Sequence, residues 1–165
     1  MPLTTTGICI QILSSISTYR RERDRCSEND CKVVLNVLIR KFSEPLAKQG
    51  RQRVYVSPSA KTYVGKTFKD HVFPVGEIMS QLLALPDDAL APTDANVARL
   101  DAMLADMLVL VTITDIENAA LNAAGCQRRM PKAWSDPGHQ HFQDPWARYK
   151  AVGISELVGN DTQSC

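Results

Sequence analysis

Residues 108–125 read LVLVTITDIENAALNAAG and decide the fold class. The run LVLVTI is apolar and rich in β-branched residues, which is typical of a strand that is buried on both faces. Thr114 and Glu117 follow with the spacing of a capping box, so a helix begins there and is expected to end at Gly125. A buried strand that leads directly into a capped helix predicts a domain that contains both sheet and helix.

Helical periodicity covers much of the remaining chain. Ser27 and Asp30 have the spacing of a second capping box, and Pro74 and Thr93 stand where two later helices begin. Apolar residues recur at helical spacing in each segment. The predicted helices cover residues 4–24, 27–50, 74–85 and 94–107.

One further strand is predicted at residues 53–57, RVYVS, and Ser57-Pro58 then resembles the start of a short helix. We therefore predict an α+β fold, a predominantly helical single domain with a small two- or three-stranded sheet. It covers residues 1–154, with a basic helical part at 1–69, a mixed acidic part at 70–154 and a flexible tail at 155–165. A doubly wound parallel sheet is disfavoured because strands are few and no Gly-rich turn joins strand to helix.

Composition indicates a globular protein of 165 residues, and no apolar stretch approaches the roughly 20 residues of a membrane span. The first 16 residues lack the basic start of a signal peptide, so a cytoplasmic location and no membrane partner are expected. Five cysteines without a C-x-x-C pair argue against a disulfide framework or a zinc site. Cys26 and Cys31 are close enough to be oxidised together, although reduced thiols are expected.

Charge is unevenly distributed along the chain. Residues 1–69 contain 13 Lys and Arg against 5 Asp and Glu, whereas residues 70–165 contain 6 against 13, within a net charge of +1. One basic surface of this kind can bind the phosphates of nucleic acid. The alternative is that the two halves pack together and their charges pair. The predicted nucleic-acid-binding residues are Arg20, Arg21, Arg23, Arg25, Arg51 and Arg53.

Residues 70–74, DHVFP, are similar to the opening of the H-N-H nuclease motif. The resemblance implies that His71 is a general base and that Asp70 helps to hold a divalent cation such as Mg²⁺. It covers these five residues only, and the family's Gly-rich turn and loop Asn are absent. The alternative for His71 is a structural residue at the entrance to a helix.

A second resemblance is to small uncharacterised bacterial proteins with the pattern (D/E)HxxP, ITxxE, MPxxW and ARY. It covers about half of the chain and implies no mechanism. The pattern maps to Asp70, His71 and Pro74, then Ile113, Thr114 and Glu117, then Met130, Pro131 and Trp134, then Ala147, Arg148 and Tyr149. In a nuclease, Arg148 would stabilise phosphate charge and Tyr149 would position the strand.

Other candidates have structural explanations. Glu117 has a role as the capping glutamate, so catalysis there is disfavoured. His139 and His141 are not accompanied by further ligands at a spacing that is typical of a metal site. Trp134 and Trp146 either stack on bases or fasten the loop-rich tail to the core, and the second explanation is preferred.

The sequence does not decide whether the protein is an enzyme. The preferred hypothesis is a small nucleic-acid-binding protein, with nuclease activity based on His71. The alternative is a non-enzymatic bacterial or mobile-element interaction protein, of inhibitor or immunity type, that binds a protein partner through charged faces. Walker, Rossmann and nucleophile-elbow patterns are absent from the sequence, which argues against the chemistry that they support.

Overall fold

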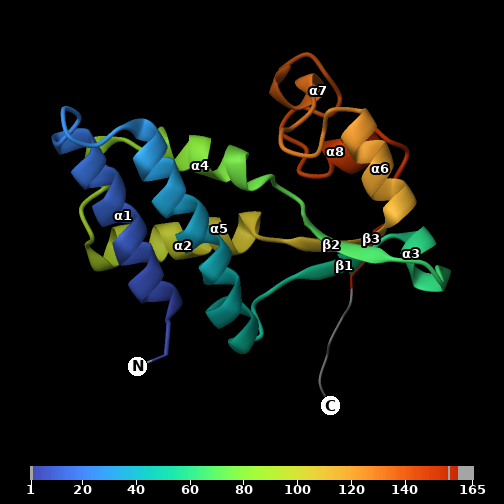
Figure 1. The fold of residues 1–165 in the computed structure, drawn as a ribbon, viewed down its shortest axis with the longest axis horizontal. Coiled ribbons are helices and arrows are strands. Elements are labelled where there is room, and N and C mark those ends of the chain that lie inside the picture. Colours follow the sequence, from blue (N-terminus) through green and yellow to red (C-terminus); the bar gives the residue numbers. More distant parts are fainter. Residues whose placement is uncertain (1, 156, 160–165) are drawn as a thin grey trace. The chain divides into compact units, whose positions relative to one another are not determined.

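The computed structural model describes residues 2–155 and 157–159 (Figure 1). The chain groups into two compact units, each built from two stretches of sequence. Unit 1 comprises Met1–Gln52 and Ile78–Met107, and unit 2 comprises Arg53–Glu77 and Leu108–Cys165. The predominantly helical α+β class is confirmed. One domain over residues 1–154 stays a prediction, and residues 156 and 160–165 of the predicted tail lie outside the described residues.

Unit 1 is helical. It contains α1 (Thr5–Arg21), α2 (Glu28–Lys48), α5 (Asp94–Met107), the short 3₁₀ helix η1 (Asp87–Ala89) and most of α4 (Val75–Leu83). The core is formed where α1, α2 and α5 pack together, and its fully buried side chains include Ile12, Leu35 and Leu104. The sequence-predicted helices are therefore present, with ends that differ by a few residues.

Local hydrogen bonds explain where these helices begin and end. The Thr4 hydroxyl accepts the Gly7 amide at the start of α1. At the start of α2, Ser27 and Asp30 form both hydrogen bonds of a capping box. The helix continues through Pro45, and Gly50 follows its end with φ +68°, a conformation that glycine adopts without steric cost.

Unit 2 contains a four-stranded mixed sheet within the described residues. Its strands are β1 (Val54–Val56), β2 (Thr67–His71), β3 (Leu110–Thr114) and β4 (Val158–Gly159), in the order β2-β3-β1-β4. β1 and β3 are parallel, whereas β2 pairs antiparallel with β3 and β4 pairs antiparallel with β1. The sheet has one strand more than the two or three that the sequence predicted.

Four short helices accompany this sheet: α3 (Pro58–Thr62), α6 (Asp115–Ala123), α7 (Lys132–Ser135) and α8 (Ala147–Lys150). Thr114 and Glu117 form the predicted capping box of α6. In Figure 1, α6 and α8 lie on one face of the sheet. The core of unit 2 lies on that face, where Val111 and Ile113 pack with Leu121 of α6 and Tyr149 of α8.

β2 was not predicted from the sequence. Its residues, TFKDH, are mostly polar, because β2 is an edge strand and only one of its faces packs on the core. His71 is the last residue of this strand, and α4 begins four residues later at Val75. No helix among the described residues is long and apolar enough to cross a membrane. The cytoplasmic location stays a prediction.

Candidate functional site

The guanidinium of Arg148 is the centre of a buried polar network in unit 2. The residue is only 1% exposed, and a guanidinium has five N–H donors. The guanidinium donates to the carbonyl oxygens of Cys126 (2.7 Å), Gln127 (3.1 Å), His71 (2.6 Å) and Val72 (3.3 Å). It also forms an ion pair with the Asp70 carboxylate at 3.3 Å. With four carbonyls and one carboxylate around a buried guanidinium, a phosphate could bind Arg148 only by displacing one of them.

Tyr149 completes this network. Its side chain is fully buried, and its hydroxyl donates to the Asp70 carboxylate at 2.8 Å. Burial, followed by the charge of Asp70, raises the pKa of Tyr149 well above its ordinary value. The phenol is therefore held in its neutral form, as a hydrogen-bond donor.

The structure thus brings together all four predicted catalytic residues, Asp70, His71, Arg148 and Tyr149. Within the network, however, His71 contributes its carbonyl oxygen rather than its imidazole. The network joins α8 to the end of β2 and to the turn after α6. Roles for Arg148 and Tyr149 on a phosphate stay predictions that this geometry does not favour.

Strand alternation separates Asp70 from the His71 imidazole. Successive side chains of a strand point to opposite faces of the sheet. Phe68 and Asp70 lie on the covered face, where Phe68 packs on the core and Asp70 meets Tyr149. His71, at the end of the same strand, therefore projects with Lys69 toward the opposite face. Asp70 and His71 do not form the side-chain dyad that an H-N-H site would use.

The opposite face of the sheet is half-exposed and mixed in character. In the register of β2 and β3, Lys69 lies opposite Thr112 and His71 lies opposite Leu110. Val54 of β1 in turn lies opposite Leu110, so an apolar strip borders the polar edge. These side chains are intermediate in exposure, except for Lys69, which is exposed. We call this surface the open face.

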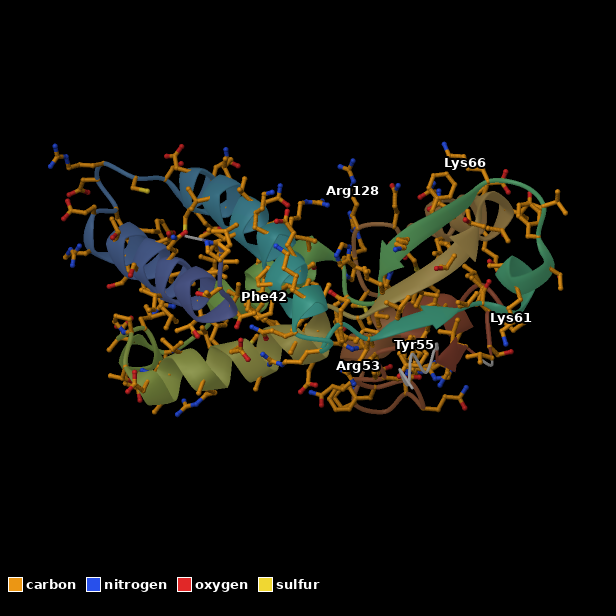
Figure 2. All side chains as sticks on the ribbon, turned by 90° about the horizontal axis from the view of Figure 1, so that it is seen from below. Phe42, Arg53, Tyr55, Lys61, Lys66 and Arg128 are labelled. Atoms are coloured by element: carbon orange, nitrogen blue, oxygen red, sulfur yellow. The ribbon has the colours of Figure 1, made fainter. Side chains whose placement is uncertain are left out.

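Exposed cations follow the edge of the sheet that β2 forms. Lys66 precedes β2, and its ammonium lies 4.7 Å from the centre of the Phe68 ring, so it lies on the covered side of the edge, whereas Lys69 lies on the open side. Arg128 belongs to the turn that Arg148 ties to the far end of β2, because Arg148 binds the Gln127 and His71 carbonyls together. Figure 2 labels Lys66 and Arg128 near the two ends of β2. We call Lys66, Lys69 and Arg128 the β2-edge cluster.

None of the three β2-edge cations makes an ion pair within the part of the chain that the structure describes. Two carboxylates of unit 2 accept from neutral donors: Asp115 accepts from the Tyr63 hydroxyl, and Glu117 accepts from Ser57 and from the Thr114 amide. Two others, Asp70 and Asp144, pair with Arg148 and Lys150. None of these four carboxylates pairs with a β2-edge cation.

The basic residues predicted in unit 1 are partly committed to the fold. Arg20 is 2.5 Å from Asp87 and donates to the carbonyl oxygens of Leu83 and Leu85, and Arg51 pairs with Asp101. Arg23 lies over the Tyr19 ring, with 5.8 Å from its guanidinium carbon to the ring centre. Arg21 is 3.5 Å from Glu22, and Arg25 is exposed in the loop after α1.

Folding removes most of the charge asymmetry seen along the sequence. Unit 1 combines basic helices with the acidic α5 segment and has 10 Lys and Arg against 10 Asp and Glu. Unit 2 has 9 against 8, so the formal charges are 0 and +1. The ion pairs of Arg20 and Arg51 fit the alternative in which the two halves of the sequence pair their charges. Binding by Arg20, Arg21, Arg23, Arg25, Arg51 and Arg53 stays a prediction.

The two tryptophans of the loop-rich C-terminal segment pack against other aromatic residues of unit 2. The Trp146 ring lies 5.0 Å from the Tyr55 ring in an edge-to-face arrangement, and Trp134 lies 6.3 Å from Phe73 in the same arrangement. Such contacts fasten a loop-rich segment to a core. They fit the structural explanation for both tryptophans.

The His139 and His141 pair is held by local contacts. His139 accepts the His141 amide through Nδ1, and Nδ1 of His141 lies 3.3 Å from Asp144. Over residues 2–155 and 157–159, no group of three or more His, Cys, Asp or Glu is arranged to hold a metal ion.

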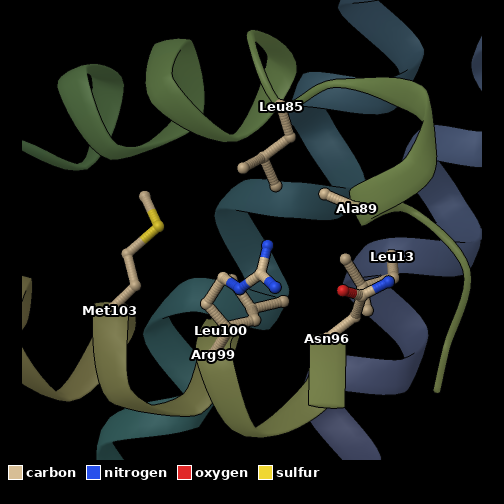
Figure 3. A pocket seen from close by; sticks show the side chains of 7 residues that line it. All are labelled: Leu13, Leu85, Ala89, Asn96, Arg99, Leu100 and Met103. Carbon is tan, nitrogen blue, oxygen red and sulfur yellow. The ribbon is translucent and has the colours of Figure 1, made fainter. Parts of the chain in front are cut away.

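An apolar cavity in unit 1 is too small for a ligand. Figure 3 shows it between α5, α1 and the segment that contains η1. Its volume is about 30 Å³, which exceeds the roughly 10–15 Å³ that one water molecule needs but is far below the ~300 Å³ of a small-molecule site. The residues that line it are Leu13, Leu85, Ala89, Asn96, Arg99, Leu100 and Met103.

Comparison of the chain with protein-family models, with curated proteins and with solved structures gives no match in any of the three. A functional assignment therefore depends on the geometry of the chain itself. Arg128 has no signal in the sequence, because its position beside β2 depends on tertiary contacts. Lys69 and His71 are neighbours on one face only because TFKDH is a strand, which the pairing of β2 with β3 establishes.

We expect Arg148→Lys to lower the free energy of unfolding by about 2–4 kcal/mol, because an ammonium with three donors cannot reach the four carbonyl acceptors that the planar guanidinium binds. Urea denaturation would measure the loss. Arg129→Lys is the matched control, since Arg129 is exposed, and it should change stability by less than about 0.5 kcal/mol. Equal stability of the two variants would show that the Arg148 network does not hold unit 2 together.

Tyr149→Phe tests the pKa of the buried phenol. The folded-state pKa is raised, so the contribution of Tyr149 to stability is present below its unfolded pKa of about 10 and is lost as pH rises above that value. The variant should be less stable than the wild type by about 1 kcal/mol at neutral pH. This difference should shrink at alkaline pH, as measured by denaturation from pH 7 upward. A constant difference would contradict the raised pKa.

Proposed function

We propose that the protein binds nucleic acid, with the β2-edge cluster as the phosphate-binding surface. The observation that supports this proposal is that Lys66, Lys69 and Arg128 are exposed and make no ion pair within the described residues. Cations of this kind gain free energy from phosphate by releasing its counterions.

The length of the cluster suits a nucleic-acid strand. From Lys66 to the end of β2 the chain extends roughly 17 Å at about 3.3 Å per residue. Successive phosphates of one strand in a duplex rise by about 3.4 Å, so several phosphates lie within this distance. Thr67, Thr112 and the His71 imidazole lie with Lys69 on the open face and supply hydrogen-bonding groups.

Binding should depend on the β2-edge cations. In the triple variant Lys66→Gln, Lys69→Gln, Arg128→Gln, we expect an affinity at least about tenfold weaker and a salt dependence whose slope falls by about three. Fluorescence anisotropy with labelled single- and double-stranded DNA and RNA at several salt concentrations would measure both.

The matched control is the triple variant Arg21→Gln, Arg23→Gln, Arg25→Gln, which removes the same charge from unit 1. Loss of binding in this variant alone would move the interface to the surface predicted from the sequence. If the wild type binds none of the four nucleic acids, the proposal fails. The lysines would then have the role of exposed charges that protect an edge strand from pairing with other chains.

Cleavage of the bound strand is a second candidate function, and the position of His71 beside Lys69 on the open face favours it. The imidazole would accept a proton from an attacking water, whose oxygen bonds to phosphorus as the bond to the leaving oxygen breaks and that oxygen takes a proton from solvent. Lys69 would stabilise the developing negative charge. This pairing replaces the Asp70-His71 dyad that the H-N-H resemblance implies.

In the cleavage test, His71→Ala should abolish the activity, and His139→Ala, which removes an exposed imidazole elsewhere, should retain it. Both variants and the wild type would be incubated with DNA and RNA in Mg²⁺, Mn²⁺ or EDTA, and their folding would be checked by circular dichroism. Activity in EDTA would identify metal-free cleavage. Binding without cleavage by the wild type would leave a binding protein and reject the nuclease.

Exposed valines on α2 favour the alternative, in which the chain binds a protein partner. Val33, Val34 and Val37 are between 45% and 59% exposed on one side of α2. Exposed apolar side chains that cluster on one helix are typical of protein contact sites. A wild type that neither binds nor cleaves nucleic acid would direct the search to a protein partner at α2.

A further inference from the structure

Cys26 and Cys31 flank the capping box that begins α2. With Ser27 as the N-cap, Cys26 occupies the position before the cap and Cys31 the fourth helical position. Side chains at these two positions pack against each other in the hydrophobic staple, because the extended cap turns the chain back over the first helical turn. The start of α2 therefore directs both thiols toward one point.

Cys31 is the shielded thiol of the two. Burial, followed by the nearby Cys26, raises the pKa of the Cys31 thiol. Cys31 is 3% exposed, and its thiol lies 3.9 Å from the Ser15 carbonyl oxygen of α1. Cys26 is half-buried, and its thiol lies 3.8 Å from the Ser27 carbonyl oxygen. The thiol before the cap is thus partly exposed, whereas the thiol in the first turn of α2 is shielded.

The difference in burial predicts that Cys26 and Cys31 react with peroxide at different rates. A peroxide reaches an accessible cysteine first, whereas a buried cysteine with a raised pKa reacts slowly. Redox-sensitive cysteines commonly have a second thiol nearby that resolves the oxidised first one. Cys9 and Cys126 are buried, and burial raises the pKa of Cys9 to about 12. Both cysteines should therefore stay reduced in peroxide and are the internal controls.

We propose that Cys26 and Cys31 are a redox modification site, at which hydrogen peroxide produces a reversible disulfide. The Cys26 thiolate attacks a peroxide oxygen, the O–O bond breaks, and the cysteine becomes a sulfenic acid as water is released. The Cys31 thiolate then attacks the sulfenic sulfur, and a second water leaves. Two thiols are oxidised and one peroxide is reduced to two waters. A thiol reductant reverses the reaction by exchange.

The disulfide ties the loop between α1 and α2 to the first turn of α2. This loop includes Arg23 and Arg25, which belong to the basic surface predicted from the sequence. The modification site lies in unit 1 and the β2-edge cluster in unit 2. The inference therefore does not rest on the proposed function, and either can fail without the other.

The sequence provides a direct assay for the disulfide. Trypsin cleaves after Arg25 and Lys32 and releases the peptide CSENDCK, which contains both cysteines. The folded protein would be treated with hydrogen peroxide, denatured, alkylated with iodoacetamide and digested. Mass spectrometry should find this peptide unalkylated and lighter by two hydrogen atoms, and dithiothreitol before alkylation should restore two alkylated cysteines. The peptides of Cys9 and Cys126 should remain alkylated throughout.

Two variants and a comparison with the unfolded protein test whether the disulfide depends on the folded structure or only on the closeness of the two cysteines in the sequence. Cys31→Ser should leave Cys26 as sulfenic or sulfinic acid, and Cys26→Ser should leave Cys31 reduced. The wild-type disulfide should form several-fold faster in the folded protein than in urea. An equal or slower rate in the folded state, or a peptide with two alkylated cysteines after peroxide treatment, would overturn the proposal.

Discussion

Unit 2 depends on the buried guanidinium of Arg148. Removing a charge from water is costly unless hydrogen bonds and an opposite charge replace its interactions with the solvent, and here four hydrogen bonds and the Asp70 carboxylate do so. All four hydrogen-bond acceptors are main-chain carbonyls, so the interaction fixes mainly backbone. It sets the end of β2 against α8 and against the turn that includes Arg128. The positions of Lys69 and His71 relative to Arg128 follow from this constraint.

The same constraint explains why the predicted catalytic residues converge without forming the predicted site. Asp70 faces the core because Tyr149 and Arg148 lie there, and alternation along β2 then directs His71 to the other face. A histidine and a carboxylate that are adjacent in sequence are separated by the sheet itself. Any chemistry of His71 must therefore use groups of the open face, of which Lys69 is the neighbouring cation.

Charge acts differently in the two units. In unit 1, cations of α1 and of the chain after α2 pair with carboxylates of the later sequence segment, as Arg20 does with Asp87 and Arg51 with Asp101. In unit 2, Lys150 pairs with Asp144, but hydroxyl and amide donors engage Asp115 and Glu117. Lys66 and Lys69 remain at the surface without an ion pair within the described residues. The balance of formal charge is similar in the two units, so the availability of cations to a ligand depends on the identity of their neighbours rather than on net charge.

The sequence by itself determined the features that depend on short-range contacts. The capping boxes of Ser27 and Thr114 join residues three positions apart, and helical periodicity placed α1, α2 and α5. Only the tertiary structure decided the candidate sites. The carbonyl oxygens that Arg148 binds belong to residues 21 to 77 positions away, and β2 is a strand because β3 lies beside it. The polar pattern of β2 contains too little apolar periodicity to predict pairing, since an edge strand buries only one face.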